Sequence, residues 1–259
     1  MSGIVSSTFF SPTHTSRTIA RTLAAELAQR LGKAVEETDW TLPAGRGHAR
    51  ALGPDDVLVL SFPVYSGRMP ELLEASMAGL TGQGTPAVVA AVYGNRAYED
   101  ALLEARDMLT ANGFVVTAGG AFIGEHSFSR KVAAGRPDAG DLALARELAQ
   151  RAADKIATGS PAGVAISGDR PYRDRWPGLV VKPKTTDDCT ECMTCAEGCP
   201  AGIISFDNPR EAGDGCLRCM ACVKHCPAGA KYFDDEKLLG FATLLETKFM
   251  DRKEPELFV

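Results

Sequence analysis

The sequence predicts an α/β protein with a doubly wound, parallel, five-stranded sheet in residues 1–158, followed by a smaller α+β unit. Apolar runs alternate with helical patterns over the first 158 residues, and all eight cysteines lie between positions 189 and 226. The length of 259 residues suits one α/β domain with an appendage of roughly 100 residues or fewer. Apolar residues make up 45% of the chain, which is enough to bury a core.

Composition and charge exclude several classes of function. No stretch approaches the roughly 18 consecutive apolar residues of a membrane-spanning helix, and the first seven residues lack the basic segment and cleavage site of a signal peptide. The net charge of −5 comes without a basic patch long enough to follow a phosphate backbone, so nucleic-acid binding is not expected. We therefore expect a globular cytoplasmic protein.

The strands and helices of the first domain are predicted from hydrophobic periodicity. Four of the five predicted strands are located by apolar runs: residues 4–10, 57–62, 87–93 and 114–123. Apolar residues that recur every three or four positions predict helices between and after these runs: residues 19–31, 98–109 and 142–156. This alternation predicts a parallel sheet, with any ligand in the crevice at the carboxyl ends of its strands.

Hydroxyl groups crowd the loop after the first predicted strand. Residues 11–17, here the hydroxyl loop, lead into a helix whose first N–H groups and positive dipole end favour a phosphate. The hydroxyls could hold that phosphate or could only cap the helix. No GxxxxGK or GxGxxG motif offers another phosphate site. The candidate ligands are the hydroxyls of Ser11, Thr13, Thr15 and Ser16 and the amides of His14 and Arg17.

Two more loops at the same edge of the sheet combine tyrosine with glycine. Residues 63–70, the Tyr65 loop, include Pro63, Val64, Tyr65, Ser66 and Gly67. Residues 93–99, the Tyr93 loop, include Tyr93, Gly94, Asn95, Arg96 and Tyr98. Tyr65 and Tyr98 offer flat faces for stacking, and Gly67, Gly94 and Asn95 offer backbone contacts to a ring edge. Either tyrosine alone could instead be a half-buried packing residue.

The cysteines form two copies of the pattern C-x2-C-x2-C-x3-C-P, with Cys216 lying 27 positions after Cys189. In this pattern three thiolates hold three corners of an iron–sulfur cube, and the fourth cysteine ligates the other copy's cluster. The spacing predicts two [4Fe-4S] clusters with crossed ligands. One is held by Cys189, Cys192, Cys195 and Cys226, and the other by Cys216, Cys219, Cys222 and Cys199.

Two other interpretations of the cysteines remain open. A disulfide framework has no need of two identical runs and does not suit a cytosolic protein. Structural zinc requires only two close pairs in each site, so it leaves the third cysteine of each copy unused. His225 and Lys224, beside Cys226, are expected on a solvated edge.

Charge is unevenly distributed along the second half of the chain. Residues 185–236 contain 10 acidic and 4 basic residues, which favours docking onto basic partner surfaces. The connector, residues 159–184, contains 5 basic and 2 acidic residues and could lie along this acidic unit. Residues 236–259 are expected to form a helix that packs on the protein, followed by a tail.

The three loops together resemble those of flavodoxins, and residues 185–235 resemble bacterial-type two-cluster ferredoxins. The whole chain is similar to the flavodoxin and ferredoxin fusion proteins of anaerobic bacteria and archaea. The resemblance implies FMN, with its phosphate in the hydroxyl loop and its ring between the Tyr65 and Tyr93 loops. His14 is a departure, because flavodoxin loops commonly carry glycine there and a positive φ strains histidine.

These expectations lead to an electron-transfer protein that passes electrons between FMN and the two clusters, and on to redox partner proteins. FMN exchanges one or two electrons and each cluster exchanges one, so joining them interconverts paired and single electrons. The alternative is a reductase of a small-molecule acceptor, such as a quinone, corrinoid or free flavin, fed by the clusters. A pocket between Tyr65, Tyr98 and residues 125–127 would favour that enzyme. A cofactor-free scaffold stabilised by zinc is a third hypothesis.

Overall fold

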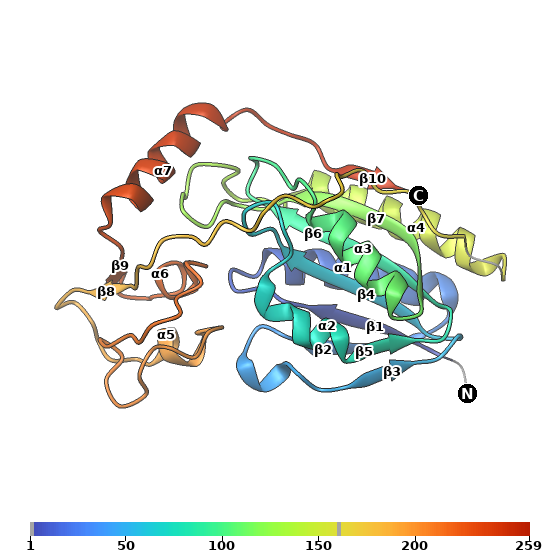
Figure 1. Cartoon of the computed structure of the whole chain (residues 1–259), viewed down its shortest axis with the longest axis horizontal. Helices are drawn as coiled ribbons and strands as arrows, with labels where there is room; N and C mark the ends of the chain where they lie inside the picture. The colour runs from blue at the N-terminus through green and yellow to red at the C-terminus, as the bar shows by residue number, and fades with distance from the viewer. Residues whose placement is uncertain (1–2, 160–161) are drawn as a thin grey trace.

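The computed structural model describes residues 3–159 and 162–259, and Figure 1 shows the whole chain. The first part contains β1 (Ile4–Phe9), α1 (Thr15–Leu31), β2 (Ala34–Asp39), η1 (Pro43–Gly45), β3 (Arg50–Leu52), β4 (Val57–Pro63), η2 (Glu71–Leu73), α2 (Glu74–Ala78), β5 (Leu80–Gly82), β6 (Thr85–Tyr93), α3 (Ala101–Ala111), β7 (Phe114–Ile123) and α4 (Ala139–Ala157). The second part contains β8 (Lys184–Thr185), α5 (Thr194–Glu197), α6 (Ala221–Lys224), β9 (Lys231–Tyr232), α7 (Glu236–Lys248) and β10 (Glu256–Phe258).

The central sheet has the strand order β10-β7-β6-β4-β1-β2. Neighbouring pairs from β2 to β7 are all parallel. Counted in chain order, these parallel strands follow the order 2-1-3-4-5, which is the flavodoxin-like form of the doubly wound sheet. The predicted α/β class and parallel sheet are therefore confirmed.

The predicted strand count is wrong, because the sheet has six strands rather than five. The sixth strand, β10, comes from the C-terminal tail and pairs antiparallel with β7, with Leu257 opposite Gly120. In Figure 1 this tail returns from α7 to lie along the edge of the sheet. The tail therefore belongs to the α/β fold, although 98 residues separate the end of α4 from the start of β10.

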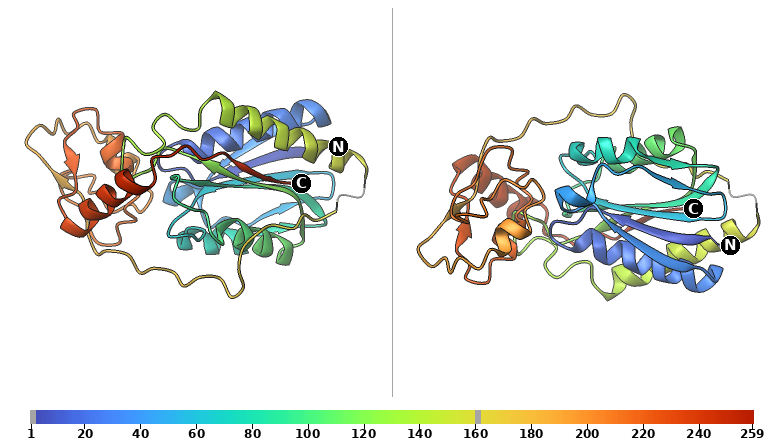
Figure 2. Two further views of the ribbon diagram at one scale, coloured as in Figure 1. Left: turned by 90° about the horizontal axis from the view of Figure 1, so that it is seen from above. Right: turned by 90° about the horizontal axis from the view of Figure 1, so that it is seen from below.

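Helices cover both faces of the sheet, as Figure 2 shows. The strands are buried on both sides because alternate side chains point to opposite faces. Val59 and Val88 pack in the core under α1 and α4, and Leu60 and Val89 pack in the core under α3. This buried sheet fixes the loops at the carboxyl ends of β1, β4, β6 and β7.

The cysteine module, residues 185–235, repeats itself in backbone conformation as well as in sequence. Glu191 and Arg218, which are 27 positions apart, both have φ 55°, and Met193 and Met220 have φ 62° and 63°. The short helices α5 and α6 follow the second of these positions in each copy. The internal repeat predicted from the sequence is therefore a repeat of structure.

The cysteine module lies beyond the carboxyl ends of the parallel strands (Figure 1), and α7 returns from it toward the α/β domain. Lys224 was expected on a solvated edge of the module, but it contacts the α/β domain instead. Lys224 Nζ donates hydrogen bonds to Glu125 Oε1 at 2.6 Å and to the carbonyl oxygen of His126 at 3.0 Å. Both partners belong to the α/β domain, so Lys224 loses water but gains a charged partner.

Two more contacts join the module to the α/β domain. His225 Nε2 donates to the carbonyl oxygen of Pro12 at 3.0 Å, and its ring stacks on His14 with centroids 4.4 Å apart. Arg46 Nη2 donates to the carbonyl oxygen of Pro200 at 2.8 Å. His225 and Pro200 each adjoin a cysteine of the module.

The arginines of the connector pair with the α/β domain rather than with the acidic module. Arg170 binds Asp107 with a 2.7 Å contact, and Arg175 binds Glu104 at 2.7 Å. The contacts to the module come from lysines, with Lys184 binding Asp234 at 2.7 Å. Within the described residues, no helix combines the length and apolar character needed to cross a membrane.

Candidate functional site

A central cavity of about 530 Å³ lies at the carboxyl ends of β1, β4, β6 and β7. The α/β domain supplies one wall from all three predicted loops and from the segment after β7: Pro12, Thr13, Thr15, Pro63, Val64, Tyr65, Ser66, Gly67, Val92, Tyr93, Gly94, Arg96, Ala97, Gly124, Glu125, His126, Ser127 and Phe128. The other wall comes from the connector, the cysteine module and α7: Arg173, Trp176, Leu179, Leu217, Arg218, Cys219, Lys237, Leu238 and Phe241.

In the hydroxyl loop, some of the predicted phosphate ligands form hydrogen bonds with other residues of the loop. Ser11 has a structural role, because its Oγ accepts a hydrogen bond of 2.9 Å from the Arg17 amide. The His14 amide is also engaged, donating to the carbonyl oxygen of Ser11 at 3.1 Å. Both amides thus form hydrogen bonds within the loop in this structure, and their roles toward a phosphate stay predictions. The amides of Thr15 and Ser16, in the first turn of α1, have no partner inside the helix.

Ser16 is the most informative residue of this loop. The residue is fully buried, and its Oγ has no hydrogen-bond partner among the described residues. Because a buried hydroxyl without a partner is costly, the loop favours a ligand oxygen at this point. The hydroxyl-bearing residues Thr13 and Thr15 line the central cavity beside it.

His14 occupies the left-handed conformation that its position was suspected to require, with φ 70°. An L-residue pays a conformational cost there, which a glycine would avoid. Stacking against His225 holds the His14 ring in place. The pKa of His14 is lowered, first by burial and then by the nearby charges of Arg17 and His225.

The Tyr65 and Tyr93 loops meet across the central cavity, and each contains a non-glycine residue of positive φ. Ser66 has φ 53° and Asn95 has φ 63°. At Gly94, an added Cβ would lie 2.4 Å from Cδ2 of His126, so only glycine allows this close approach. Tyr65 is held edge-on to Phe10, with ring centroids 6.4 Å apart. Burial raises the pKa of Tyr65 well above its usual value, so its hydroxyl stays protonated.

Two predicted ring contacts, Asn95 and Tyr98, lie outside the wall of the central cavity. Asn95 Nδ2 donates to the carbonyl oxygens of Phe249 and Asp251, at 2.7 and 2.8 Å. Tyr98 donates a 2.6 Å hydrogen bond to Glu256 Oε2. Both side chains hold the C-terminal segment, a role that sequence reasoning could not assign because β10 was not expected.

Glu104 of α3 is a positioning residue that the sequence reasoning missed. Its carboxylate accepts from Arg68 Nε at 2.8 Å and from the Met69 amide at 2.9 Å, and its side chain is 5% exposed. It also accepts from Arg175 of the connector at 2.7 Å. Glu104 therefore fixes the Tyr65 loop and the connector together. Glu104 lies off the apolar stripe predicted for this helix, so no pattern in the sequence marked it.

His126 lines the cavity as a neutral imidazole. Burial lowers its pKa to about 4, and the charges of Lys224 and Arg96 add to this shift. Its Nδ1 accepts a hydrogen bond of 3.1 Å from the Phe128 amide, so the ring proton of the neutral form resides on Nε2. His126 can therefore donate one hydrogen bond from Nε2.

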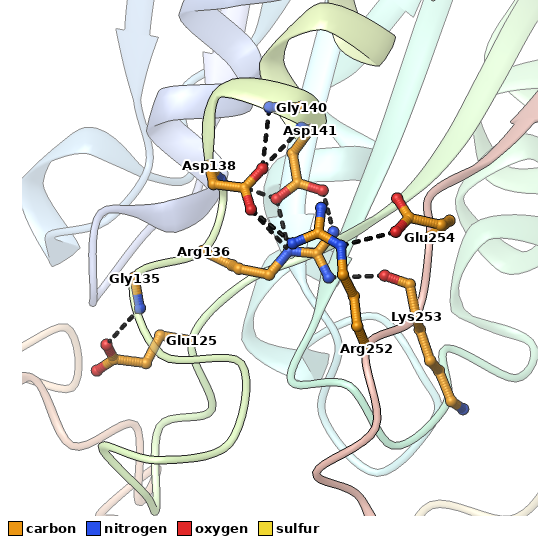
Figure 3. A network of polar contacts seen from close by, with 9 residues as sticks. All are labelled: Glu125, Gly135, Arg136, Asp138, Gly140, Asp141, Arg252, Lys253 and Glu254. Carbon is orange, nitrogen blue, oxygen red and sulfur yellow. Dashed lines mark hydrogen bonds and ion pairs between the residues drawn. The ribbon is translucent and has the colours of Figure 1, made fainter.

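The C-terminal tail after α7 is fastened by a network of charged groups, shown in Figure 3. Arg136 Nε donates to Asp141 Oδ2 at 2.7 Å, and Arg136 Nη1 donates to the carbonyl oxygen of Lys253 at 2.6 Å. Arg252 Nη1 donates to Asp138 Oδ2 at 2.7 Å. These contacts tie the segment after α7 to the start of α4.

Two much smaller cavities lie inside the cysteine module, with volumes of about 20 and 10 Å³. The first, the near cysteine cavity, is lined by Cys199, Cys216, Cys219 and Cys222. The second, the far cysteine cavity, is lined by Cys189, Cys192, Cys195 and Cys226. These groups match the crossed sets predicted from the spacing, with one cysteine of each set coming from the other copy.

The thiols of the module are free, and some sulfur atoms accept backbone hydrogen bonds. The Arg218 amide donates to Cys216 Sγ at 3.4 Å, and the Ala230 amide donates to Cys226 Sγ at 3.2 Å. Burial raises the pKa of Cys219 and of Cys222 to about 12. In residues 3–159 and 162–259, no three side chains of His, Cys, Asp or Glu form a group that could hold a single metal ion.

Comparison of the sequence with protein-family models gives no match. A comparison with curated proteins also gives no match.

Solved structures similar to the chain cover about 60% of it. The flavodoxin of Streptococcus pneumonia TIGR4 is 16% identical, with a TM-score of 0.43, and the match covers 59% of this chain and 99% of that protein. For the reduced flavodoxin of Megasphaera elsdenii these values are 17%, 0.41, 58% and 99%. For an NAD(P)H:quinone oxidoreductase of Methanothermobacter marburgensis they are 16%, 0.36, 60% and 96%.

Proposed function

We propose that this protein carries electrons between FMN and two [4Fe-4S] clusters, and exchanges them with redox partner proteins. The observation that carries the proposal is the central cavity, which is lined by all three predicted flavin loops and by Cys219 of the cysteine module. One site thus unites the groups suited to a flavin with one of the groups suited to an iron–sulfur cluster.

The residues of the central cavity fit FMN. Ser16 does not itself line the cavity, but it adjoins the lining residue Thr15, and its Oγ is buried without a partner among the described residues. The first-turn amides of α1 add donors for the phosphate. Tyr65 offers a ring for stacking, and Gly94 permits close backbone approach. Ser16, Thr13 and Thr15 would hold the phosphate, with the ring between the Tyr65 and Tyr93 loops.

The residues of the two cysteine cavities fit [4Fe-4S] clusters. Each cavity is lined by four cysteines, which is the number of thiolates that such a cluster takes. The amide donors to Cys216 and Cys226 are of the kind that tunes cluster potentials. When bound, flavin and clusters supply one-electron and two-electron chemistry, while this chain supplies position, burial and hydrogen bonds.

The test is to purify the protein without oxygen, record its absorption spectrum and quantify flavin, iron and acid-labile sulfide. We expect one FMN and eight iron and eight sulfide ions per chain, since two four-iron clusters are assigned to eight cysteines. Stoichiometric zinc without sulfide would overturn the cluster assignment. A protein with clusters but no flavin would overturn the assignment of the central cavity.

A second candidate function, reduction of a bound small molecule, is favoured by the walls of the central cavity. Beyond the flavin loops, this cavity has apolar side chains from Trp176, Leu217 and Phe241 and basic side chains from Arg173 and Lys237. A planar acceptor of the quinone, corrinoid or free-flavin kind would suit the apolar side chains, and any negatively charged substituent on it would suit the basic ones. The expected pocket differs from prediction in one respect, because Tyr98 does not line it.

The two candidate functions are separated by adding such acceptors to the reduced holoprotein. If the protein is a reductase, the reduced holoprotein is reoxidised at a rate that saturates with acceptor concentration. Phe241→Ala should then raise the half-saturating concentration of the acceptor. Leu244→Ala, on the same helix at a 40% exposed position, is the matched control. A pure carrier shows no saturation, and its rate does not respond to Phe241→Ala.

A further inference from the structure

The two cysteine cavities differ in their relation to the central cavity. Leu217 and Cys219 line both the central cavity and the near cysteine cavity. The same side chains therefore border the two spaces, and they form the wall between them. Tyr65 and Leu217 also pack against one shared hydrophobic core cluster, so the wall is continuous with the α/β domain.

The far cysteine cavity has no such connection. Its lining residues all fall within residues 189–231, and none of them lines the central cavity. Cys192, one of its four cysteines, is exposed at the surface. The two copies of the repeat are thus alike in conformation but unlike in surroundings.

One of the contacts between the module and the α/β domain is made by a residue that lines the near cavity. Pro200, which lines the near cavity, accepts a 2.8 Å hydrogen bond from Arg46. Arg46 is itself fixed by donating to the carbonyl oxygen of Thr41 at 2.8 Å and lies over the ring of Phe10. This arginine holds the near cavity against the end of the sheet.

We propose that the near set, Cys199, Cys216, Cys219 and Cys222, is the one that exchanges electrons with the flavin, and that Leu217 couples the two sites. The inference rests on the proposed function. In the exchange, one electron leaves the reduced flavin and enters the near cluster, and the proton released from the flavin passes to water. The far set then exchanges electrons with the near set and with a partner protein.

Crossed ligation provides a matched pair of variants. Cys199 lies in the first copy but lines the near cavity, and Cys226 lies in the second copy but lines the far cavity. In the holoprotein without oxygen, the flavin is reduced by a light pulse and the bleaching of cluster absorbance is followed. We expect Cys199→Ser to lose the fast bleaching phase and Cys226→Ser to keep it. The reverse pattern, or equal slowing in both variants, would overturn the proposal.

A second pair keeps the test informative if a cysteine variant fails to assemble. Leu217 and Thr190 are equivalent positions, 27 residues apart, and they line the near and far cavities respectively. Each is replaced by the other's residue. Leu217→Thr should shift the midpoint potential of one cluster and change the fast phase, because a hydroxyl beside a cluster alters its potential. Thr190→Leu should shift the other cluster and leave the fast phase unchanged.

Failure of this inference is distinguishable from failure of the proposed function. If flavin, or iron and sulfide, is missing from the purified protein, the proposed function fails. If all are present and the fast phase follows Cys226 and Thr190 instead of Cys199 and Leu217, only the present inference fails. Electron paramagnetic resonance during a redox titration identifies which cluster signal each variant shifts, independently of any turnover.

Discussion

Lys224 of the cysteine module donates a 2.6 Å hydrogen bond to the carboxylate of Glu125 in the α/β domain. The two side chains are 10% and 25% exposed, so their attraction is only partly screened by water. Burial lowers the pKa of Lys224, although Glu125 opposes this shift. The contact orients the module, because Lys224 lies two residues before Cys226 and Glu125 lines the central cavity.

We predict that Lys224→Met loosens the module from the α/β domain. The variant leaves Glu125 without its charged partner, which should destabilise the interface by about 1.5 to 3 kcal/mol. Limited proteolysis should then cut the connector, residues 159–184, faster than in the parent protein. Lys131→Met is the matched control, because Lys131 forms a 2.7 Å pair with Glu246 but is 71% exposed. Equal proteolysis of the parent and Lys224→Met would refute the role of this pair.

The buried pair of Arg136 and Asp141 carries the second prediction. Their side chains are 5% and 0% exposed, so Arg136→Met leaves a buried carboxylate uncompensated and should destabilise the fold by about 3 to 5 kcal/mol. Arg252→Met, which breaks only the exposed contacts to Asp138 and Glu254, should have much less effect. Thermal unfolding of each variant, compared with that of the parent protein, measures these losses of stability. A similar change in both would show that the burial of Arg136 contributes nothing.

The strands that could be predicted are those buried on both faces. β4, β6 and β7 are continuous apolar runs because α1 and α4 cover one face and α3 covers the other. β2 was not identified, because five of its six residues are exposed and no apolar period marks it. β10 was missed for another reason, since three residues become a strand only when Asn95, Arg136 and Tyr98 fix the tail beside β7.

The sequence predicts those parts of the candidate site that are marked by residues close together in the chain. The cysteine spacing anticipated which thiols line each cavity, and loops at the ends of parallel strands were expected to meet at one edge. The opposite wall could not be predicted, because Trp176, Arg218 and Phe241 come from three segments that meet only through tertiary packing. Ser11 shows a further limit, since a capping serine and a ligand serine look the same in sequence.

The third prediction separates a ligand serine, Ser16, from a capping serine, Ser11. Ser16→Ala removes a buried hydroxyl that has no partner among the described residues, so FMN affinity should fall by about tenfold to a hundredfold while riboflavin affinity is retained. Ser11→Ala removes the acceptor of the Arg17 amide and should weaken both flavins alike, with a stability loss of about 0.5 to 2 kcal/mol. Flavin fluorescence titrations measure both ligands on both variants. Parallel losses of FMN and riboflavin in Ser16→Ala would end the phosphate assignment.

The last prediction concerns pH and His126. The pKa of this imidazole falls from its ordinary 6.5 to about 4 on folding, mainly because of burial. Between pH 6.5 and about pH 4, His126 is protonated in the unfolded chain but neutral in the folded protein. Stability from neutral His126 is therefore complete above pH 6.5 and declines as pH falls toward 4. The full loss is about 3 kcal/mol.

The measurement compares unfolding midpoints at about pH 7.5 and about pH 5 for the parent and for His126→Gln, which cannot take up a proton in this range. The parent should lose more stability on acidification than the variant, because only the parent has this imidazole to protonate on unfolding. His48→Gln, at an exposed histidine of the η1 region, controls for loss of any histidine. Since Lys224 and Arg96 add to the shift, Lys224→Met should also reduce the acid sensitivity. If the parent and His126→Gln lose the same stability between the two pH values, His126 is not held neutral by the fold.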